Sequence, residues 1–366
     1  MAVTSDLATD QRVHRNCMAL AGMGYEVQLV GRVLPSSPPV PQRSYPCKRF
    51  NLPFTKGPLF YASYNLRLFV YLVFKKNDLI FSNDLDTLPA CWLASKLRGT
   101  KLVYDSHEYY TGVPELEGRP MVRRIWKTIE RIIFPKLKTV ITVNESIANL
   151  YRKEYGNEIH VIRNVPMQSA FQPTNSDREE IRRKMGVTAS EKLLILQGSG
   201  INRDRGAEEA VMAMQYMQQA KLVLLGGGDV VKELEHLAAS CGVTDKVLFL
   251  PRMPYEEMMK YTAACDLGLT FDKNTNINYR FSLPNKIFDY IRAGIPVMAS
   301  RLPEVEKIVD GYGIGWFISS HEPSMMAREM EAALQDESAI ARCRKNLQLA
   351  AADLTWENEL KKYPKL

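Results

Sequence analysis

Short apolar runs rich in β-branched residues alternate with segments of helical periodicity along most of the chain. Strands are predicted at residues 26–30, 79–81, 101–104, 139–142, 193–197, 222–225, 247–250, 267–270 and 297–299. A helix from Gln11, with Asp10 as its N-cap, precedes the first of these strands, and Asn144 is a second predicted N-cap. Apolar strands that alternate with helices form parallel sheets covered on both faces, so the pattern predicts a doubly wound α/β fold.

The alternation pauses once, in a polar stretch that ends near Ser176, and restarts at residues 193–197. This break predicts two Rossmann-like domains that face a cleft, with residues 1–164 in the first and 165–354 in the second. A C-terminal helix at about residues 355–366 is expected to pack back onto the first domain.

The segment 281–296 has the features of a loop that leads into a helix N-terminus. Pro284 suits a helix start, because its fixed φ and missing donor cost nothing there. Lys286 and Asp289 then share one helix face, and Gly294 ends the helix. A cation and backbone amides at a helix start suit a diphosphate, and a carboxylate one turn later suits a ribose. An ordinary helix with a solvated Lys–Asp pair accounts for the spacing equally well.

Small residues follow two predicted strands of the second half. Gly198 and Gly200 come directly after the strand at 193–197. Arg205 precedes a predicted helix, and residues 226–228 are all glycine. These groups lie at the C-terminal ends of strands, where open α/β sheets bind their ligands. Tight turns explain the glycines equally well.

Composition narrows the class of protein. The chain has 366 residues, 46% of them hydrophobic, and a formal net charge of +7. Its six cysteines show no C-x-x-C spacing, which argues against a zinc site or a disulfide framework and fits a reducing cytosol. No signal peptide is expected, and no apolar run reaches the roughly 20 residues of a membrane span. Tryptophans are not interleaved with basic residues, so anionic small molecules or anionic lipid are expected as partners rather than nucleic acid.

Several short motifs resemble those of one known family, the retaining GT-B glycosyltransferases of the family 4 type. In the second half they are QG at 197–198, RG at 205–206, GGG at 226–228 and the run from SLPNK to AGIP at 282–296. In the first half they are DQRVHR at 10–15, GYEVQLVGR at 24–32 and DSHE at 105–108. The resemblance covers nearly the whole chain and implies a GT-B fold, with an acceptor-side first domain and a donor-binding second domain for a nucleotide sugar.

The resemblance also implies roles for individual residues. Arg205 and Lys286 would clamp the donor diphosphate, and His107 matches the family's histidine near the transferred sugar. Asp105 and Glu108 flank His107 and are expected to orient its ring. The expected donor-binding residues, which include a base-contacting loop at 251–253, are Gly198, Gly200, Arg203, Gly227, Arg252, Met253, Ser282, Leu283, Asn285 and Asp289. The nucleotide sugar would be a substrate, and neither a cofactor nor a metal ion is expected.

Two positions depart from the family's pattern. Phe281 stands where many members carry the first of two glutamates, while Asp289 matches the second, which holds the ribose. Phe281 cannot accept a hydrogen bond from a sugar hydroxyl. Either the backbone amides of the next two residues bind the sugar, or the site is degenerate. Gly200 replaces the family's arginine, and Arg203 is the proposed substitute.

Asp84 and Asp86 form a D-x-D motif directly before a predicted helix at 87–97. Such a motif is the manganese and diphosphate ligand of the other glycosyltransferase fold. Its position between a strand and a helix favours N-capping by Asp86 instead.

Two amphipathic stretches concern the acceptor side. Residues 119–138 combine an apolar helical face with a basic one, and residues 59–76 are apolar and aromatic with two lysines at the end. Both patterns fit peripheral contact with an inner membrane, and both fit helices packed on a core.

The sequence therefore predicts a cytoplasmic enzyme, either free or peripheral on the cytoplasmic face of a membrane. It would transfer a hexosyl or N-acetylhexosaminyl group, with retention, to a glycan or lipid-linked acceptor in polysaccharide biosynthesis. The alternatives are a sugar-nucleotide epimerase of GT-B architecture and a catalytically inactive GT-B subunit that binds a nucleotide or a partner. A dinucleotide oxidoreductase is disfavoured, since no G-x-G-x-x-G motif opens the first βα unit.

Overall fold

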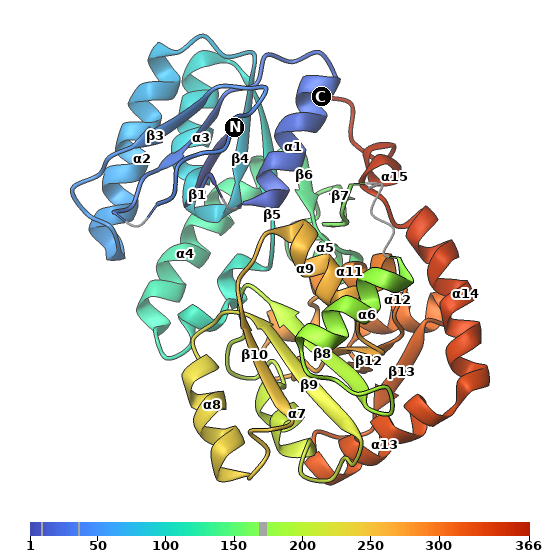
Figure 1. Ribbon diagram of the computed structural model, residues 1–366. Coiled ribbons are helices and arrows are strands. Elements are labelled where there is room, and N and C mark those ends of the chain that lie inside the picture. Colours follow the sequence, from blue (N-terminus) through green and yellow to red (C-terminus); the bar gives the residue numbers. More distant parts are fainter. Residues whose placement is uncertain (9, 36, 168–173) are drawn as a thin grey trace. The chain divides into compact units, whose positions relative to one another are not determined.

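The computed structural model describes residues 1–8, 10–35, 37–167 and 174–366 (Figure 1). Its internal contacts divide the chain into two units. Unit 1 comprises Met1–Asn164 together with Leu360–Leu366, and unit 2 comprises Val165–Glu359.

Unit 1 is built on a seven-stranded parallel sheet with the order β3-β2-β1-β4-β5-β6-β7. Its strands are β1 Ala2–Asp6, β2 Leu29–Arg32, β3 Cys47–Phe50, β4 Leu79–Asn83, β5 Lys101–Ser106, β6 Thr139–Thr142 and β7 Ile159–Val161. Its helices are α1 Gln11–Gly22, α2 Gly57–Phe74, α3 Asp84–Arg98, α4 Pro120–Ile133 and α5 Glu145–Tyr155, with 3-10 turns at Tyr110–Gly112, Pro114–Leu116 and Phe134–Lys136. The strand order reverses between β1 and β4, which is the point where doubly wound sheets bind ligands.

Helix starts and core packing in unit 1 follow from local sequence. The side chains of Asp10 and Asn144 accept hydrogen bonds from the third backbone amide of α1 and α5, at 3.0 and 2.9 Å, so both predicted N-caps are confirmed. Tyr64 and Leu68 of α2 pack with Cys91 of α3 in one buried cluster beside the sheet. This cluster holds α3 firmly against the strands that precede it.

Unit 2 is built on a six-stranded parallel sheet with the order β10-β9-β8-β11-β12-β13. Its strands are β8 Lys192–Gly198, β9 Ala220–Gly226, β10 Val247–Pro251, β11 Leu267–Thr270, β12 Val297–Ser300 and β13 Gly315–Ile318. Its helices are α6 Asn175–Lys184, α7 Ala207–Ala213, α8 Val231–Ser240, α9 Tyr255–Ala263, α10 Ile277–Arg280, α11 Asn285–Ala293, α12 Pro303–Tyr312, α13 Pro323–Gln335, α14 Glu337–Asp353 and α15 Trp356–Leu360. The reversal here falls between β8 and β11. The predicted class of two doubly wound parallel-sheet units is confirmed.

The last residues of the chain return to unit 1. Tyr363 donates a hydrogen bond from its hydroxyl to Oδ1 of Asn16 at 2.9 Å, and Tyr25 donates to the carbonyl of Leu366 at 3.4 Å. The predicted helix over 355–366 is too long, because α15 ends at Leu360. Pro364 explains the early end, since the residue before a proline avoids helical backbone angles.

Several strands of the two sheets were not anticipated. β1, β3, β7 and β13 lie outside the predicted strands, and β2 begins at Leu29 rather than at residue 26. Each of the four unpredicted strands has at most two fully buried residues, so none shows the pattern of a strand buried on both faces.

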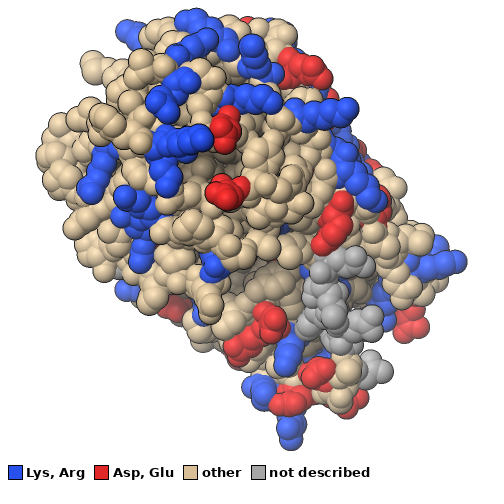
Figure 2. Space-filling model, turned by 90° about the horizontal axis from the view of Figure 1, so that it is seen from above, with Lys and Arg blue, Asp and Glu red and all other residues tan. Residues whose placement is uncertain are grey.

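Within the described ranges, none of the helices combines the length and the apolar character needed to cross a membrane. On the face shown in Figure 2, Lys and Arg side chains cover more of the surface than Asp and Glu side chains do, in keeping with the net charge of +7.

Candidate active site

His107 follows the end of β5 and lies between two carboxylates of unit 1. Its Nδ1 is 3.2 Å from Oδ2 of Asp84, and its Nε2 is 3.4 Å from Oδ2 of Asp105. Asp105 is fully buried and accepts hydrogen bonds from α1, from Arg12 Nη2 at 2.6 Å and from Asn16 Nδ2 at 2.7 Å. Side chains from α1, α3 and β5 therefore fix the position of the imidazole.

Electrostatic effects favour the charged forms of His107 and Asp105. Burial disfavours the imidazolium, but the charges of Asp84 and Asp105 outweigh it and raise the pKa of His107 to about 9. Burial also disfavours ionised Asp105, yet the guanidinium of Arg12 holds the pKa of this carboxyl well below its usual range. His107 is consequently a cation at neutral pH and can face an anionic or electron-rich group of a ligand.

The prediction that Asp86 caps the helix at 87–97 is wrong. α3 begins at Asp84, so Asp86 lies inside its first turn. Asp84 has a φ of 57°, a region that aspartate tolerates better than most residues, and its Oδ1 accepts the backbone N–H of His107 at 2.9 Å. Asp86 accepts a hydrogen bond from the Thr4 hydroxyl, and burial together with the charge of Asp84 raises the pKa of Asp86 to about 7. The D-x-D motif therefore positions His107 through Asp84 and does not provide the N-cap of α3.

Arg205 is placed by a tight turn between β8 and α7. Asp204 and Gly206 on either side of it have φ values of 65° and 76°. A Cβ on Gly206 would lie 2.3 Å from the Cβ of Phe271, so the close contact requires glycine. The backbone N–H of Lys273 donates to the carbonyl of Asp204 at 2.9 Å. These contacts hold Arg205 beside the C-terminal end of β11.

Arg205, Asp272 and Lys286 form a charged cluster at that strand end. Nη1 of Arg205 is 3.5 Å from Oδ1 of Asp272, which directly follows Phe271. Lys286, the second residue of α11, is 9% exposed and Asp272 is 1% exposed. Burial lowers the pKa of Lys286, and the charge of Asp272 opposes this shift while that of Arg205 adds to it. The structure therefore brings the two predicted diphosphate-binding cations together around a carboxylate.

Buried polar atoms near this cluster have no hydrogen-bond partner among the described residues. They are Arg205 Nε, Glu208 Oε2, Glu209 Oε2, Thr270 Oγ1 and both carboxylate oxygens of Asp272. Leaving one such atom unpaired costs about 1–3 kcal/mol. Unpaired donors and acceptors that gather at the C-terminal edge of a doubly wound sheet are the mark of a site for a polar ligand.

Asp289 lies on α11 one turn after Lys286, and other side chains already contact its carboxylate. Oδ2 accepts a hydrogen bond from Gln197 Nε2 at 3.1 Å, and Oδ1 accepts one from the Tyr255 hydroxyl at 3.0 Å. The Thr262 hydroxyl donates a hydrogen bond to Oε1 of Gln197 at 2.6 Å, which fixes the orientation of the Gln197 amide. Asp289 is half-buried and held in one position, as a ribose-binding carboxylate needs to be.

The remaining predicted donor-binding residues lie in loops at the same edge of this sheet. They are Gly198 at the end of β8, Gly200 and Arg203 after it, Gly227 after β9, Arg252 and Met253 after β10, Ser282 and Leu283 before α11, and Asn285 at its start. A Cβ on Gly227 would lie 2.8 Å from Nε of Arg252, so the two loops touch. Arg203 is 76% exposed and pairs with Glu233 at 3.3 Å, so it stands outside the buried cluster.

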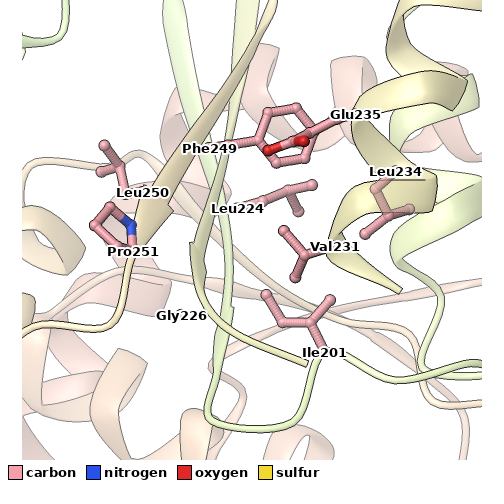
Figure 3. Close-up of a pocket in the computed structure, with 9 residues that line it drawn as sticks. All are labelled: Ile201, Leu224, Gly226, Val231, Leu234, Glu235, Phe249, Leu250 and Pro251. Atoms are coloured by element: carbon pink, nitrogen blue, oxygen red, sulfur yellow. The ribbon is translucent and has the colours of Figure 1, made fainter. Parts of the chain in front are cut away.

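An apolar pocket of about 300 Å³ adjoins these loops (Figure 3). Its lining residues are Ile201, Leu224, Gly226, Val231, Leu234, Glu235, Phe249, Leu250 and Pro251. Gly226 and Pro251 are the last residues of β9 and β10, which places the pocket at the same sheet edge. Neither Arg205 nor Lys286 lines it, so the pocket and the charged cluster are separate features of unit 2.

Comparison with known proteins yields two family matches. Residues 177–349 match the model described as "Glycosyl transferases group 1", and residues 10–165 match "Glycosyltransferase Family 4". Among curated proteins, a D-inositol 3-phosphate glycosyltransferase from Xylanimonas cellulosilytica is 24% identical over 73% of this chain and 66% of that protein. One from Corynebacterium jeikeium is 28% identical over 45% of this chain. The chain spans two thirds or less of these relatives, 66% and 41% of their lengths.

Solved structures show the same fold. Sucrose-phosphate synthase from Thermosynechococcus elongatus superimposes with a TM-score of 0.79 at 18% identity, covering 98% of this chain and 95% of that one. HepE from Anabaena, determined in complex with UDP-glucose, superimposes with a TM-score of 0.74 at 18% identity, covering 98% and 96%. The fold and the two family matches together place this chain in the family 4 type of GT-B glycosyltransferases.

Some residues of these clusters were not anticipated from the sequence. Asp272 carried no motif, although its place two residues after a predicted strand was a usable signal. Arg12 and Asn16 lie four residues apart on one face of α1, which lets both contact Asp105. Asp84, rather than Glu108, supplies the carboxylate 3.2 Å from Nδ1 of His107.

Proposed function

We propose that this chain is a glycosyltransferase that moves a sugar from a nucleoside-diphosphate sugar to a hydroxyl group of an acceptor, with retention of the anomeric configuration. The observation that carries the proposal is the buried cluster of Arg205, Asp272 and Lys286 among unpaired polar atoms at the C-terminal edge of the second sheet. The named activity of the curated relatives and the ligand of the HepE structure support it.

In this proposal Arg205 and Lys286 neutralise the departing diphosphate. The first backbone amides of α11 point toward the same region and add the positive end of the helix dipole. Preorganised charges of this kind stabilise a leaving group without reorganisation at the moment of reaction. Asp289 would hold the ribose, and the loop at Arg252 and Met253 would contact the base.

Retention is proposed because the two carboxylates that contact His107 already have other partners. Asp105 is bound to Arg12, and Asp84 accepts the N–H of His107. An oxygen of the donor's own phosphate would then take the acceptor proton, on the face from which the diphosphate leaves. His107, as a cation, would stabilise electron density near the transferred sugar.

Metal independence is part of the same proposal. Across the described ranges, His, Cys, Asp and Glu side chains form no group of three or more that could hold a metal ion. In this proposal Arg205 and Lys286 supply the charge that a divalent cation supplies elsewhere.

The acceptor is proposed to be a glycan or a lipid-linked glycan, reached by a cytoplasmic enzyme that contacts a membrane peripherally. Side chains of α4 support this: Trp126 and Ile133 are buried, but Met121, Ile125 and Ile132 are 76%, 55% and 51% exposed. Exposed apolar side chains mixed with arginines are typical of interfacial helices. The second candidate stretch, α2, likewise exposes Leu59, Leu66, Val70 and Phe74.

The test is a transfer assay with purified protein and a panel of UDP-, GDP-, ADP- and dTDP-sugars. Release of the nucleoside diphosphate with a glycosylated product would support a transferase. Conversion of the donor into an epimer without release would support an epimerase, and binding without any turnover would support an inactive subunit. Absence of binding by every nucleotide would contradict the proposal.

A further inference from the structure

The carboxylate of Asp272 lacks hydrogen-bond donors, and a diphosphate ligand would not supply them. It is 1% exposed, and neither of its carboxylate oxygens has a hydrogen-bond partner within the described residues. Arg205 approaches to 3.5 Å, which is an ion pair without a hydrogen bond. A buried carboxylate without a hydrogen-bond donor is costly.

The unmet need of Asp272 is for hydrogen-bond donors. A diphosphate offers only acceptor oxygens and carries negative charge, so it would satisfy Arg205 and Lys286 while repelling Asp272. A ligand that suits the whole cluster must therefore combine an anion with neutral O–H or N–H groups. A sugar joined to a diphosphate has that combination, and a free nucleotide places no such group beyond its terminal phosphate.

We propose that Asp272 accepts a hydrogen bond from a hydroxyl group of the transferred sugar, and that this contact makes the site select a nucleotide sugar over the nucleoside diphosphate alone. The inference rests on the proposed function and adds to it the residue that recognises the sugar. Asp272 would also provide the hydrogen-bond acceptor for the sugar that Phe281, at the position of the family's first glutamate, cannot provide.

The packing around Asp272 allows this contact to form when ligand binds. Arg205 is 29% exposed, its Nε lacks a partner, and its guanidinium stands 4.8 Å from the ring of Tyr279. It covers Asp272 without being hydrogen-bonded to it. Movement of the guanidinium toward an incoming phosphate would satisfy the cation and uncover the carboxylate for the adjoining sugar.

The competing interpretation is that Asp272 only balances the charges of Arg205 and Lys286. The two roles differ in what they predict. A counter-ion acts on the phosphates, so its loss would change the affinities for nucleoside diphosphate and nucleotide sugar by the same factor. A residue that binds the sugar affects the affinity only for ligands that carry the sugar.

The experiment is calorimetry on wild type, Asp272→Asn and the control Asp245→Asn. Asp245 is exposed and precedes β10, at the opposite edge of the same sheet. UDP, GDP, ADP and dTDP are titrated first, and then the glucose nucleotide of whichever base binds. Asp272→Asn should leave the affinity for the nucleoside diphosphate unchanged or higher and weaken the nucleotide sugar about tenfold or more. Equal factors for both ligands would overturn the inference while leaving the proposed function intact.

A second measurement needs no variant. Nucleotide sugars with single hydroxyl groups replaced by fluorine keep the size of the group but cannot donate a hydrogen bond. One such replacement should weaken binding to wild type about tenfold. If no single replacement weakens binding, Asp272 does not recognise a hydroxyl. If no nucleoside diphosphate binds wild type at all, the proposed function fails and the inference falls with it.

Discussion

The first prediction concerns Arg205 and Lys286, the two cations of the buried cluster in unit 2. Arg205→Ala and Lys286→Ala should each weaken nucleoside diphosphate binding about 10- to 100-fold, since a hydrogen bond to a charged group contributes roughly 1.5–3 kcal/mol. Arg203→Ala is the matched control, because Arg203 is 76% exposed and paired with Glu233. Calorimetry measures all three. Equal losses for the three variants would mean that the buried cluster has no special role.

Lys286 gives a second prediction at the residue scale, which concerns pH. Burial lowers the pKa of Lys286 below 10.5, so the ammonium form is lost as pH rises through that lowered value. Diphosphate affinity should fall in the same range, before free lysine would titrate. Lys286→Arg keeps its charge at every accessible pH and should flatten the profile. A profile that is identical in wild type and Lys286→Arg would contradict the assignment.

The third prediction concerns the pKa of His107, which is raised, whereas that of Lys286 is lowered. Its folded pKa of about 9 exceeds the ordinary value of 6.5, so protonation stabilises unit 1. That stability is fully present below pH 6.5 and is lost as pH rises through about 9. Proton NMR should show one of the five histidines titrating near pH 9, with its signal absent from His107→Asn. In Asp84→Asn the same signal should titrate at lower pH, and no change there would rule out the Asp84 contact.

At the scale of elements, α4 yields a prediction about membranes. Wild type should sediment with vesicles that contain an anionic phospholipid and much less with purely zwitterionic ones. Ile125→Ser should reduce that binding several-fold, because burial of such a side chain is worth about 1.5–3 kcal/mol. Leu349→Ser is the control, since Leu349 is 63% exposed but lies on α14 of unit 2. Equal effects of both substitutions, or no binding by wild type, would reject the interfacial role of α4.

The elements also show how far sequence alone can lead. Central strands such as β6 and β11 were predicted with the observed bounds, because most of their residues are buried, as in strands covered on both faces. Edge strands such as β3 and β13 have the same length but only one fully buried residue each, so they lack this pattern. Arg205 and Lys286 could be proposed as site residues because glycine and proline mark the turns beside them. Asp272 was not, since its significance lies in contacts with residues distant in sequence. The positive φ of Asp84, which brings its carboxylate to His107, likewise has no local signature.

At the scale of the whole molecule, metal dependence and stereochemistry can be tested together. If Arg205 and Lys286 neutralise the diphosphate, turnover should survive excess EDTA, and the anomeric proton signal of the product should show the configuration of the donor. An inverted product would contradict the retaining mechanism. Loss of activity with recovery on adding manganese would contradict metal independence.

The return of residues 360–366 to unit 1 has a consequence for the order in which the protein is made. The ribosome synthesises the segment Met1–Asn164 before unit 2. Tyr363, which contacts Asn16, is synthesised only after unit 2. Unit 2 is synthesised in between, which at about 5–20 residues per second takes roughly 10–40 s. During that interval Asn16 lacks the partner that it has in the finished chain. Unit 1 is therefore completed only after unit 2 has been synthesised, and unit 2 can finish folding while residues 360–366 are still missing from unit 1.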